Sequence, residues 1–200
     1  MIQLRSTSLS VEAFLEQYGE NPRYELIDGE LRDLEPTGSH ESVTGKVAGY
    51  LFSEILRQGQ RWTIPKTCLI QPPASEATAL RSDVVILDEA AFAAEPLWER
   101  EPIITSGDPI VMVVEVVSTN WQDDYGRKVE EYALLGIEEY WIVDSRGRGG
   151  VQFIDRPKQP SLTVCHLVGQ DYEKRIYRLD QPLESQRFPN LQLQLSNLMH

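Results

Sequence analysis

A single glutamate, Glu115, interrupts a hydrophobic run in the segment PIVMVVEVVS, residues 109 to 118. Such a run is typical of a strand that is buried on both faces of a sheet. An unpaired buried carboxylate costs several kcal/mol, so Glu115 requires a partner charge or a metal ion. That partner has to come from elsewhere in the chain.

A second carboxylate, Asp83, directly precedes the apolar segment VVIL. Two carboxylates on adjacent strands can lie within a few Å, and they do not both stay ionised without a cation. Mg²⁺ takes one or two carboxylates and completes its octahedral shell with water and phosphate oxygens. The pair therefore indicates a site for a divalent ion. The alternative is two unrelated acids, Asp83 capping a strand at the surface and Glu115 at a sheet edge.

Lys128 follows Glu115 by 13 residues, on a predicted helix. At helical spacing it shares a stripe with Tyr132 and Leu135, which places it at the margin of the core. From there its ammonium could reach the carboxylate pair and act on a phosphate or on an attacking water. The simpler interpretation is a surface ion pair between Asp124 and Lys128, four residues apart on one helix.

The elements that position these residues can be outlined from hydrophobic periodicity and turn signals. Helical spacing predicts three helices, over residues 9–19, 39–57 and 123–135, the second with Ser39 as its N-cap. Asp28 and Gly29 mark a hairpin within RYELIDGELRDL. Strands are predicted for the segments WTIPKTCLIQ, SDVVILD, PIVMVVEVV and EYWIVD, with a surface loop over residues 88–108. The tail GGVQFIDRP, SLTVCHLVG and RIYRLDQPLE reads as antiparallel strands, followed by FPNLQLQLSNL as a last strand or short helix.

The strand at 109–117, the helix at 123–135 and the strand at 139–144 form a strand–helix–strand unit. Both strands are apolar and the connection is short, so the unit should be a right-handed crossover between parallel neighbours. Together with the other elements it predicts a mixed α/β fold built on one central sheet.

Composition limits the class of protein. Two hundred residues with 41% apolar content suit one domain with a sizeable core. No apolar run approaches the ~20 residues of a membrane span, the N-terminus lacks the order of a signal peptide, and two distant cysteines form no disulfide framework. These features indicate a cytoplasmic protein with reduced thiols at Cys68 and Cys165.

The net charge of −12 argues against a nonspecific nucleic-acid coat. It leaves room for a nuclease, because bound cations and a local basic patch can offset it.

Several segments carry a resemblance to a known family: YELIDGEL, GSHESVTGKV, RSDVVIL, VVEVVSTNWQDDYGRKVEEYALLGIEEYWIVD and FPNLQLQLSNL. Together they resemble the Uma-two family of predicted restriction endonucleases, within the PD-(D/E)XK nuclease superfamily. The resemblance covers residues 9 to 198 and is most specific between Glu115 and Asp144.

By position, the resemblance implies that Asp83 and Glu115 are the two motif acids and that Lys128 is the catalytic lysine. Val117 occupies the usual lysine position, and in this family the lysine moves to the helix. Glu25 matches an acid of the N-terminal hairpin that implies a further metal ligand. His40 matches a histidine at a helix start, for which the resemblance implies no role.

Two departures from the pattern leave these ligands in place. Ser82 replaces the proline of the half-motif, and Trp121 stands where smaller or polar residues are expected, which could alter access of the substrate.

The resemblance implies a restriction-endonuclease-like α/β (α+β) fold, with a central mixed sheet flanked by helices, in a single domain over residues 1–200. It implies a Mg²⁺-dependent endonuclease, with Mn²⁺ as a second ion, that hydrolyses DNA. A homodimer is expected, because both strands of a duplex have to be cut. Asp83, Glu115 and Glu25 would hold the metal, and Asp83, Glu115 and Lys128 would carry catalysis. Two alternatives remain: a noncatalytic binding or assembly module, and hydrolysis of another phosphoester such as RNA.

Overall fold

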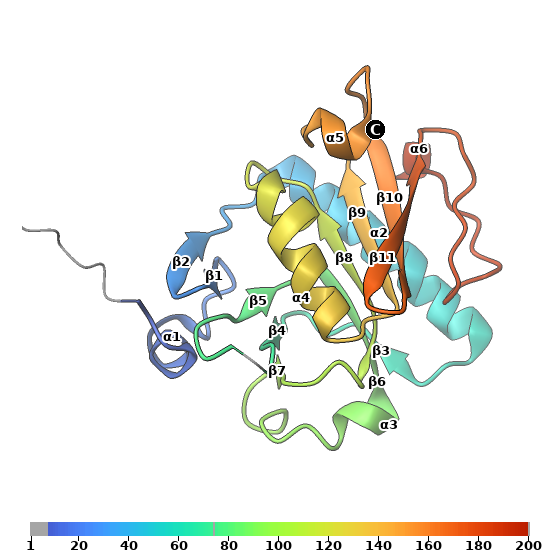
Figure 1. Cartoon of the computed structure of the whole chain (residues 1–200). Helices are drawn as coiled ribbons and strands as arrows, with labels where there is room; N and C mark the ends of the chain where they lie inside the picture. Colours follow the sequence, from blue (N-terminus) through green and yellow to red (C-terminus); the bar gives the residue numbers. More distant parts are fainter. Residues whose placement is uncertain (1–7, 74, 200) are drawn as a thin grey trace, which may run out of the picture.

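The structure, a computed structural model, describes residues 8–73 and 75–199. Its centre is a six-stranded mixed sheet in the order β11-β10-β9-β8-β6-β3 (Figure 1). β8 and β9 run parallel, and the other neighbouring pairs run antiparallel. The strands are β3 (Trp62–Thr63), β6 (Val84–Asp88), β8 (Ile110–Val116), β9 (Glu139–Asp144), β10 (Ser161–Val168) and β11 (Asp171–Tyr177).

The parallel strands β8 and β9 are joined by one helical crossover. It consists of a π-helical turn, η1 (Asp123–Arg127), that runs directly into α4 (Lys128–Leu134). Every residue of β8 and β9 is buried, as expected for strands covered on both faces. The predicted parallel pairing of residues 109–117 with 139–144 is confirmed.

Helices cover both faces of the sheet (Figure 1). Met112, Val114 and Val116 of β8 belong to the core cluster formed with α2 (Gly38–Gln58). Val113 belongs instead to the cluster that contains Tyr132 of α4. Because successive strand residues point to opposite faces, Glu115 shares the face of Val113 and points toward α4.

A hairpin and a small sheet lie beside the central sheet. The hairpin pairs β1 (Tyr24–Ile27) with β2 (Glu30–Asp33) and turns through Asp28 and Gly29, which both have positive φ. The small sheet has the order β5-β4-β7, formed by β5 (Leu80–Arg81), β4 (Leu69–Ile70) and β7 (Ile103–Ile104). A backbone bridge between Leu26 and Ala79 ties the hairpin to β5 and so fixes the position of the hairpin relative to β6.

The remaining helices are short. They are α1 (Val11–Tyr18), α3 (Glu89–Phe92), α5 (Val151–Ile154) and α6 (Leu195–Leu198). Among the residues that the structure describes, none of the helices is long and apolar enough to span a membrane.

Several boundaries differ from the sequence predictions. WTIPKTCLIQ is not one strand: Pro65 removes an amide donor, and the segment splits into β3 and β4, which belong to different sheets. Within GGVQFIDRP, residues 151–154 form the single turn of α5 and not a strand. A short apolar run such as VQFI does not distinguish a buried helix from a strand. The predicted loop at 88–108 contains α3 and β7. The N-cap of α2 is Thr37, whose side chain accepts from the amide of His40, and not Ser39.

Candidate active site

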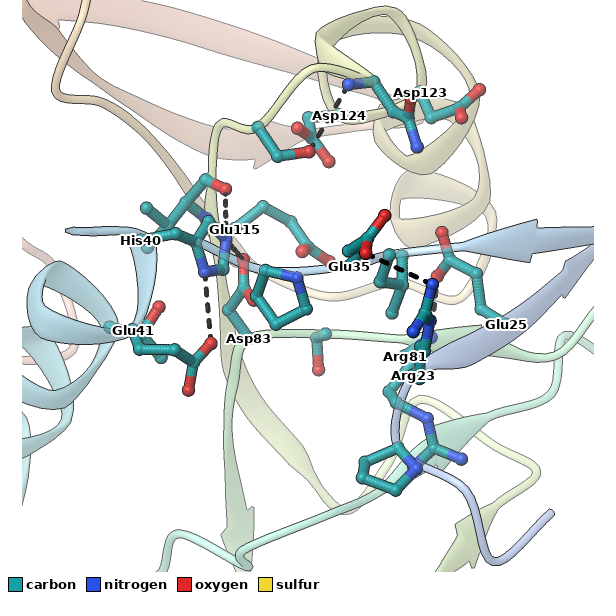
Figure 2. Close-up of a pocket in the computed structure, with 18 of the residues that line it drawn as sticks. Arg23, Glu25, Glu35, His40, Glu41, Arg81, Asp83, Glu115, Asp123 and Asp124 are labelled. Carbon is teal, nitrogen blue, oxygen red and sulfur yellow. Dashed lines mark hydrogen bonds and ion pairs between the residues drawn. The ribbon is translucent and has the colours of Figure 1, made fainter. Parts of the chain in front are cut away.

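A cleft of about 490 Å³ opens where the start of α2, the start of β6, the end of β8, the hairpin and η1 meet. All the predicted site residues line it: Glu25, His40, Asp83, Glu115 and Lys128. Figure 2 shows Asp83 and His40 on one side of the cleft, Glu25 on the other, and Glu115 between them. Residues separated by 103 positions in the sequence therefore converge on one space.

Asp83 and Glu115 are brought together by the register of β6 and β8. Val84 pairs with Val114 in this antiparallel ladder, so extending the register by one residue places Asp83 opposite Glu115. Two carboxylates at directly opposed positions repel each other. The backbone amide of Val116 donates to Oδ2 of Asp83 at 2.7 Å and holds this carboxylate at the strand ends.

Lys128 is buried, with 3% of its side chain exposed. Its Nζ lies 3.2 Å from Glu115 Oε2, 3.4 Å from Glu25 Oε2 and 3.7 Å from Asp124 Oδ1. The ammonium also donates to the carbonyl of Arg81 at 3.5 Å. A surface ion pair with Asp124, the simpler interpretation of the sequence, does not describe this residue.

The π-helical turn η1 immediately precedes Lys128. The amide of Lys128 bonds to the carbonyl of Asp123, five residues earlier, where an α-helix would use the fourth. The turn holds Asp124 and Lys128 on the buried side, where both line the cleft. Single π-helical turns occur frequently at functional sites, and sequence spacing gave no sign of this one.

Two neighbours hold the buried carboxylates in place. The hydroxyl of Tyr132 donates to Oε1 of Glu115 at 2.8 Å, so this tyrosine binds the acid directly. Glu25 accepts the backbone amide of Arg81 at 2.9 Å. The guanidinium of Arg81 is turned to the carbonyls of Tyr24 and Gly19.

His40 links α2 to the strand ends. Its Nε2 lies 2.8 Å from the carbonyl of Val116 and 3.3 Å from Asp83 Oδ2, and its Nδ1 lies 3.3 Å from Glu41. Burial opposes the charged imidazolium, but the hydrogen bond and charge of Asp83, assisted by Glu41 and the Val116 carbonyl, raise the pKa of His40 to about 9. The imidazole thus clamps Asp83 and the end of β8 together.

Negative charge exceeds positive charge in the cleft. Seven acidic residues and four Lys or Arg residues line it, a balance of −3 with His40 neutral and −2 with His40 protonated. Burial raises the pKa of Glu115 well above its usual range; Lys128 counteracts this, and Asp83, Asp124 and Glu25 add to it. Burial likewise raises the pKa of Asp124 to about 7. Burial would lower the pKa of Lys128, but the surrounding carboxylates raise it, so the ammonium stays charged.

The carboxylates of the cleft offer the type of oxygen donor that a hard divalent cation takes. Carboxylate oxygens are the ligands that Mg²⁺ and Mn²⁺ prefer, and the excess of crowded carboxylates would be relieved by added positive charge. In residues 8–73 and 75–199, however, no group of three or more His, Cys, Asp or Glu residues is arranged to hold a metal ion. The ammonium of Lys128 lies between Glu25 and Glu115, and these acids are engaged with it.

The comparison with protein families decides the relationship. A family model, Uma2, described as "Putative restriction endonuclease", matches residues 11–196. The chain belongs to the Uma2 family. Membership in this family supports a nuclease. No curated protein matches this Uma2 chain.

Solved structures share the fold of this Uma2 protein. Four chains match, and one of them is a protein from Anabaena variabilis described as "a putative nuclease belonging to DUF820". It has a TM-score of 0.70 and 14% sequence identity, and the match covers 95% of this chain and 97% of that chain. At this identity the similarity shows the fold alone. The predicted mixed α/β fold with a central sheet flanked by helices is confirmed.

Proposed function

We propose that this Uma2 protein is a metal-dependent endonuclease that hydrolyses phosphodiester bonds of DNA in the acidic cleft. The observation that carries the proposal is the convergence of Asp83, Glu115 and a buried Lys128 at the joined ends of β6 and β8. An ammonium and crowded carboxylates facing one cleft are the groups that metal-assisted hydrolysis of a phosphate requires.

Each residue of the cluster has a distinct part. Asp83, Glu115 and Glu25 would hold Mg²⁺ or Mn²⁺, and the bound ion would polarise the scissile phosphate and lower the pKa of a bound water. Lys128 orients the attacking water or stabilises charge on the phosphate in the transition state. Asp124 steadies Lys128 by its ion pair, and Tyr132 holds the carboxylate of Glu115 through its hydroxyl. His40 positions Asp83 through the end of β8.

We further propose that the protein acts as a homodimer, since one copy of the cleft serves one strand of a duplex at a time.

Both cysteines, Cys68 and Cys165, are free and buried. Their reduced state supports a cytoplasmic location.

A plasmid assay tests the activity. Supercoiled DNA is incubated with the protein in Mg²⁺, in Mn²⁺ and in EDTA, next to an RNA of matched sequence. We expect nicked or linear DNA with either ion, no cleavage in EDTA, and a loss of at least ~10²-fold in Asp83→Asn. Asp83 lies at the cleft rim and is partly exposed, so this variant should fold. Absence of DNA cleavage under every condition would contradict the proposal, and cleavage of RNA alone would correct the substrate.

A further inference from the structure

A second, smaller hollow adjoins the acidic cleft. The two share Glu35, His40 and Ser118 in their lining, and the rest of the hollow is lined mainly by residues at the start of α2 and in the loop between β9 and α5. Its volume is about 50 Å³. At ~10–15 Å³ for each water this is room for roughly three to five waters, the size of one phosphate group rather than of a base.

The lining of this hollow is unlike that of the cleft. Apart from the shared residues it is formed by Val117, by hydroxyl side chains and by the guanidinium side chains of Arg146 and Arg148. Arg146 donates through Nη2 to Ser39 Oγ at 2.6 Å, which places its charge beside the start of α2. Glu35 is the acid in this lining, and it lies 3.4 Å from Arg23.

The loop that carries these arginines is fixed by the fold. Asp144, fully buried at the end of β9, accepts the backbone amides of Arg146, Arg148 and Gly149 at 3.3, 2.9 and 2.8 Å. Gly147 has φ +62°, and a Cβ there would lie 2.8 Å from the carbonyl carbon of Gln159. The fold therefore fixes the backbone positions of Arg146 and Arg148 in the absence of a ligand.

No carboxylate of residues 8–73 or 75–199 forms an ion pair with either of these two arginines, whereas Arg127 and Arg175 elsewhere each pair with a carboxylate. The segment 145–158 contains Arg146, Arg148, Arg156 and Lys158 against Asp155, a net charge of +3 in a chain of net charge −12. Positive charge is thus concentrated beside a cleft whose own balance is negative.

We propose that Arg146 and Arg148, with the hydroxyls of Ser39 and Ser118, bind a backbone phosphate of the nucleic acid that neighbours the scissile phosphate. This inference rests on the proposed function. A polyanion is repelled by the acidic cleft and by the whole chain, so its affinity has to come from local cationic contacts. Guanidinium groups bind phosphate oxygens in a bidentate manner and suit such a contact.

Binding measured without cleavage tests the subsite. Fluorescence anisotropy of a labelled DNA duplex is followed in EDTA over a series of salt concentrations, with RNA of the same sequence as a second arm. The variant is Arg146→Gln/Arg148→Gln. The matched control is Arg100→Gln/Lys174→Gln, which removes the same charge at two exposed positions outside both cavities. Arg148→Lys keeps the charge and loses the bidentate geometry.

We expect the double variant at 146 and 148 to bind at least about tenfold more weakly at low salt, the scale of losing charge-assisted hydrogen bonds. The slope of log affinity against log salt should become shallower by about one, for one lost phosphate contact. The control should change neither quantity, and Arg148→Lys should fall between. Equal losses in both double variants, or wild-type binding by the first, would overturn the subsite and leave the nuclease proposal standing. Absence of binding to DNA and RNA by the wild-type protein would also overturn the subsite, while the plasmid assay in Mg²⁺ and Mn²⁺ decides the nuclease proposal separately.

Discussion

The ammonium of Lys128 faces three carboxylates inside the protein, those of Glu25, Glu115 and Asp124, so negative charge exceeds positive charge around it. A lysine on a helix four residues after an aspartate has an ordinary surface role in most sequences. Here the burial of Lys128 makes its charge part of the core, where removing one partner of an ion pair leaves the others uncompensated. The same charge is placed to act on a phosphate in the cleft.

Replacing Lys128 by methionine should therefore destabilise the metal-free protein strongly. Breaking a buried ion pair costs about 3–5 kcal/mol, against ~0–1 kcal/mol for an exposed pair. Urea denaturation in EDTA measures the difference, with Lys174→Met on the exposed face of β11 as the control. A loss in Lys128→Met no greater than in Lys174→Met would show that Lys128 is not held by the carboxylates.

His40 gives the metal-free protein a dependence of stability on pH. Its pKa is raised from 6.5 to about 9 in the folded state, so the imidazolium contributes stability that is complete below pH 6.5 and is lost as the pH rises through about 9. His40→Gln keeps an amide donor for the Val116 carbonyl and cannot titrate. In EDTA, the free energy of unfolding should fall between these pH values more steeply in the wild type than in His40→Gln. Equal slopes would contradict the clamp.

Among the structural elements, the sequence predicts the strands and the helix that carry the site better than the hydrogen bonds that fix its side chains. The apolar run around Glu115 predicts a strand buried on both faces, and the spacing to EYWIVD predicts the parallel crossover, because both depend on side-chain patterning. The π-helical turn η1 and the bond from His40 to the Val116 carbonyl depend on backbone geometry, which leaves no residue pattern. Tyr132 shares the helical stripe of Lys128, but only the fold shows that its hydroxyl reaches Glu115.

A divalent ion bound by Asp83 and Glu115 should stabilise the folded protein. Mg²⁺ should raise the melting temperature of the wild type, by an amount that corresponds to about 2.7 kcal/mol at a hundred times the dissociation constant. Glu115→Gln keeps an oxygen for the Tyr132 hydroxyl and removes one crowded charge. It should match or exceed wild-type stability in EDTA and lose most of the rise with Mg²⁺.

Glu173→Gln, at an exposed position of β11, is the control for loss of an acid and should keep the full rise. An equal rise with Mg²⁺ in wild type and Glu115→Gln would remove Glu115 from the metal site.

At the scale of the whole molecule, charge is distributed unevenly. The chain carries −12 overall, yet Arg146 and Arg148 of the basic segment 145–158 line a hollow that adjoins the acidic cleft. Composition alone argues against a nonspecific nucleic-acid coat and leaves room for a nuclease, and only the fold shows that the two regions are neighbours. The organisation of residues 1–200 as one domain and the assembly of two copies remain predictions.

Cleavage of a labelled DNA duplex under single-turnover conditions in Mg²⁺ shows whether Lys128 and its cleft are catalytic. It is measured for the wild type, Lys128→Gln and Lys174→Gln, with folding of each checked by melting. Lys128→Gln should keep a Mg²⁺-dependent rise in melting temperature, since a cation does not ligate a cation, and should lose at least ~10²-fold in rate. Lys174→Gln should cleave as the wild type does. Equal rates for the wild type and Lys128→Gln, or equal losses in both variants, would contradict the assignment of this cleft as the catalytic site.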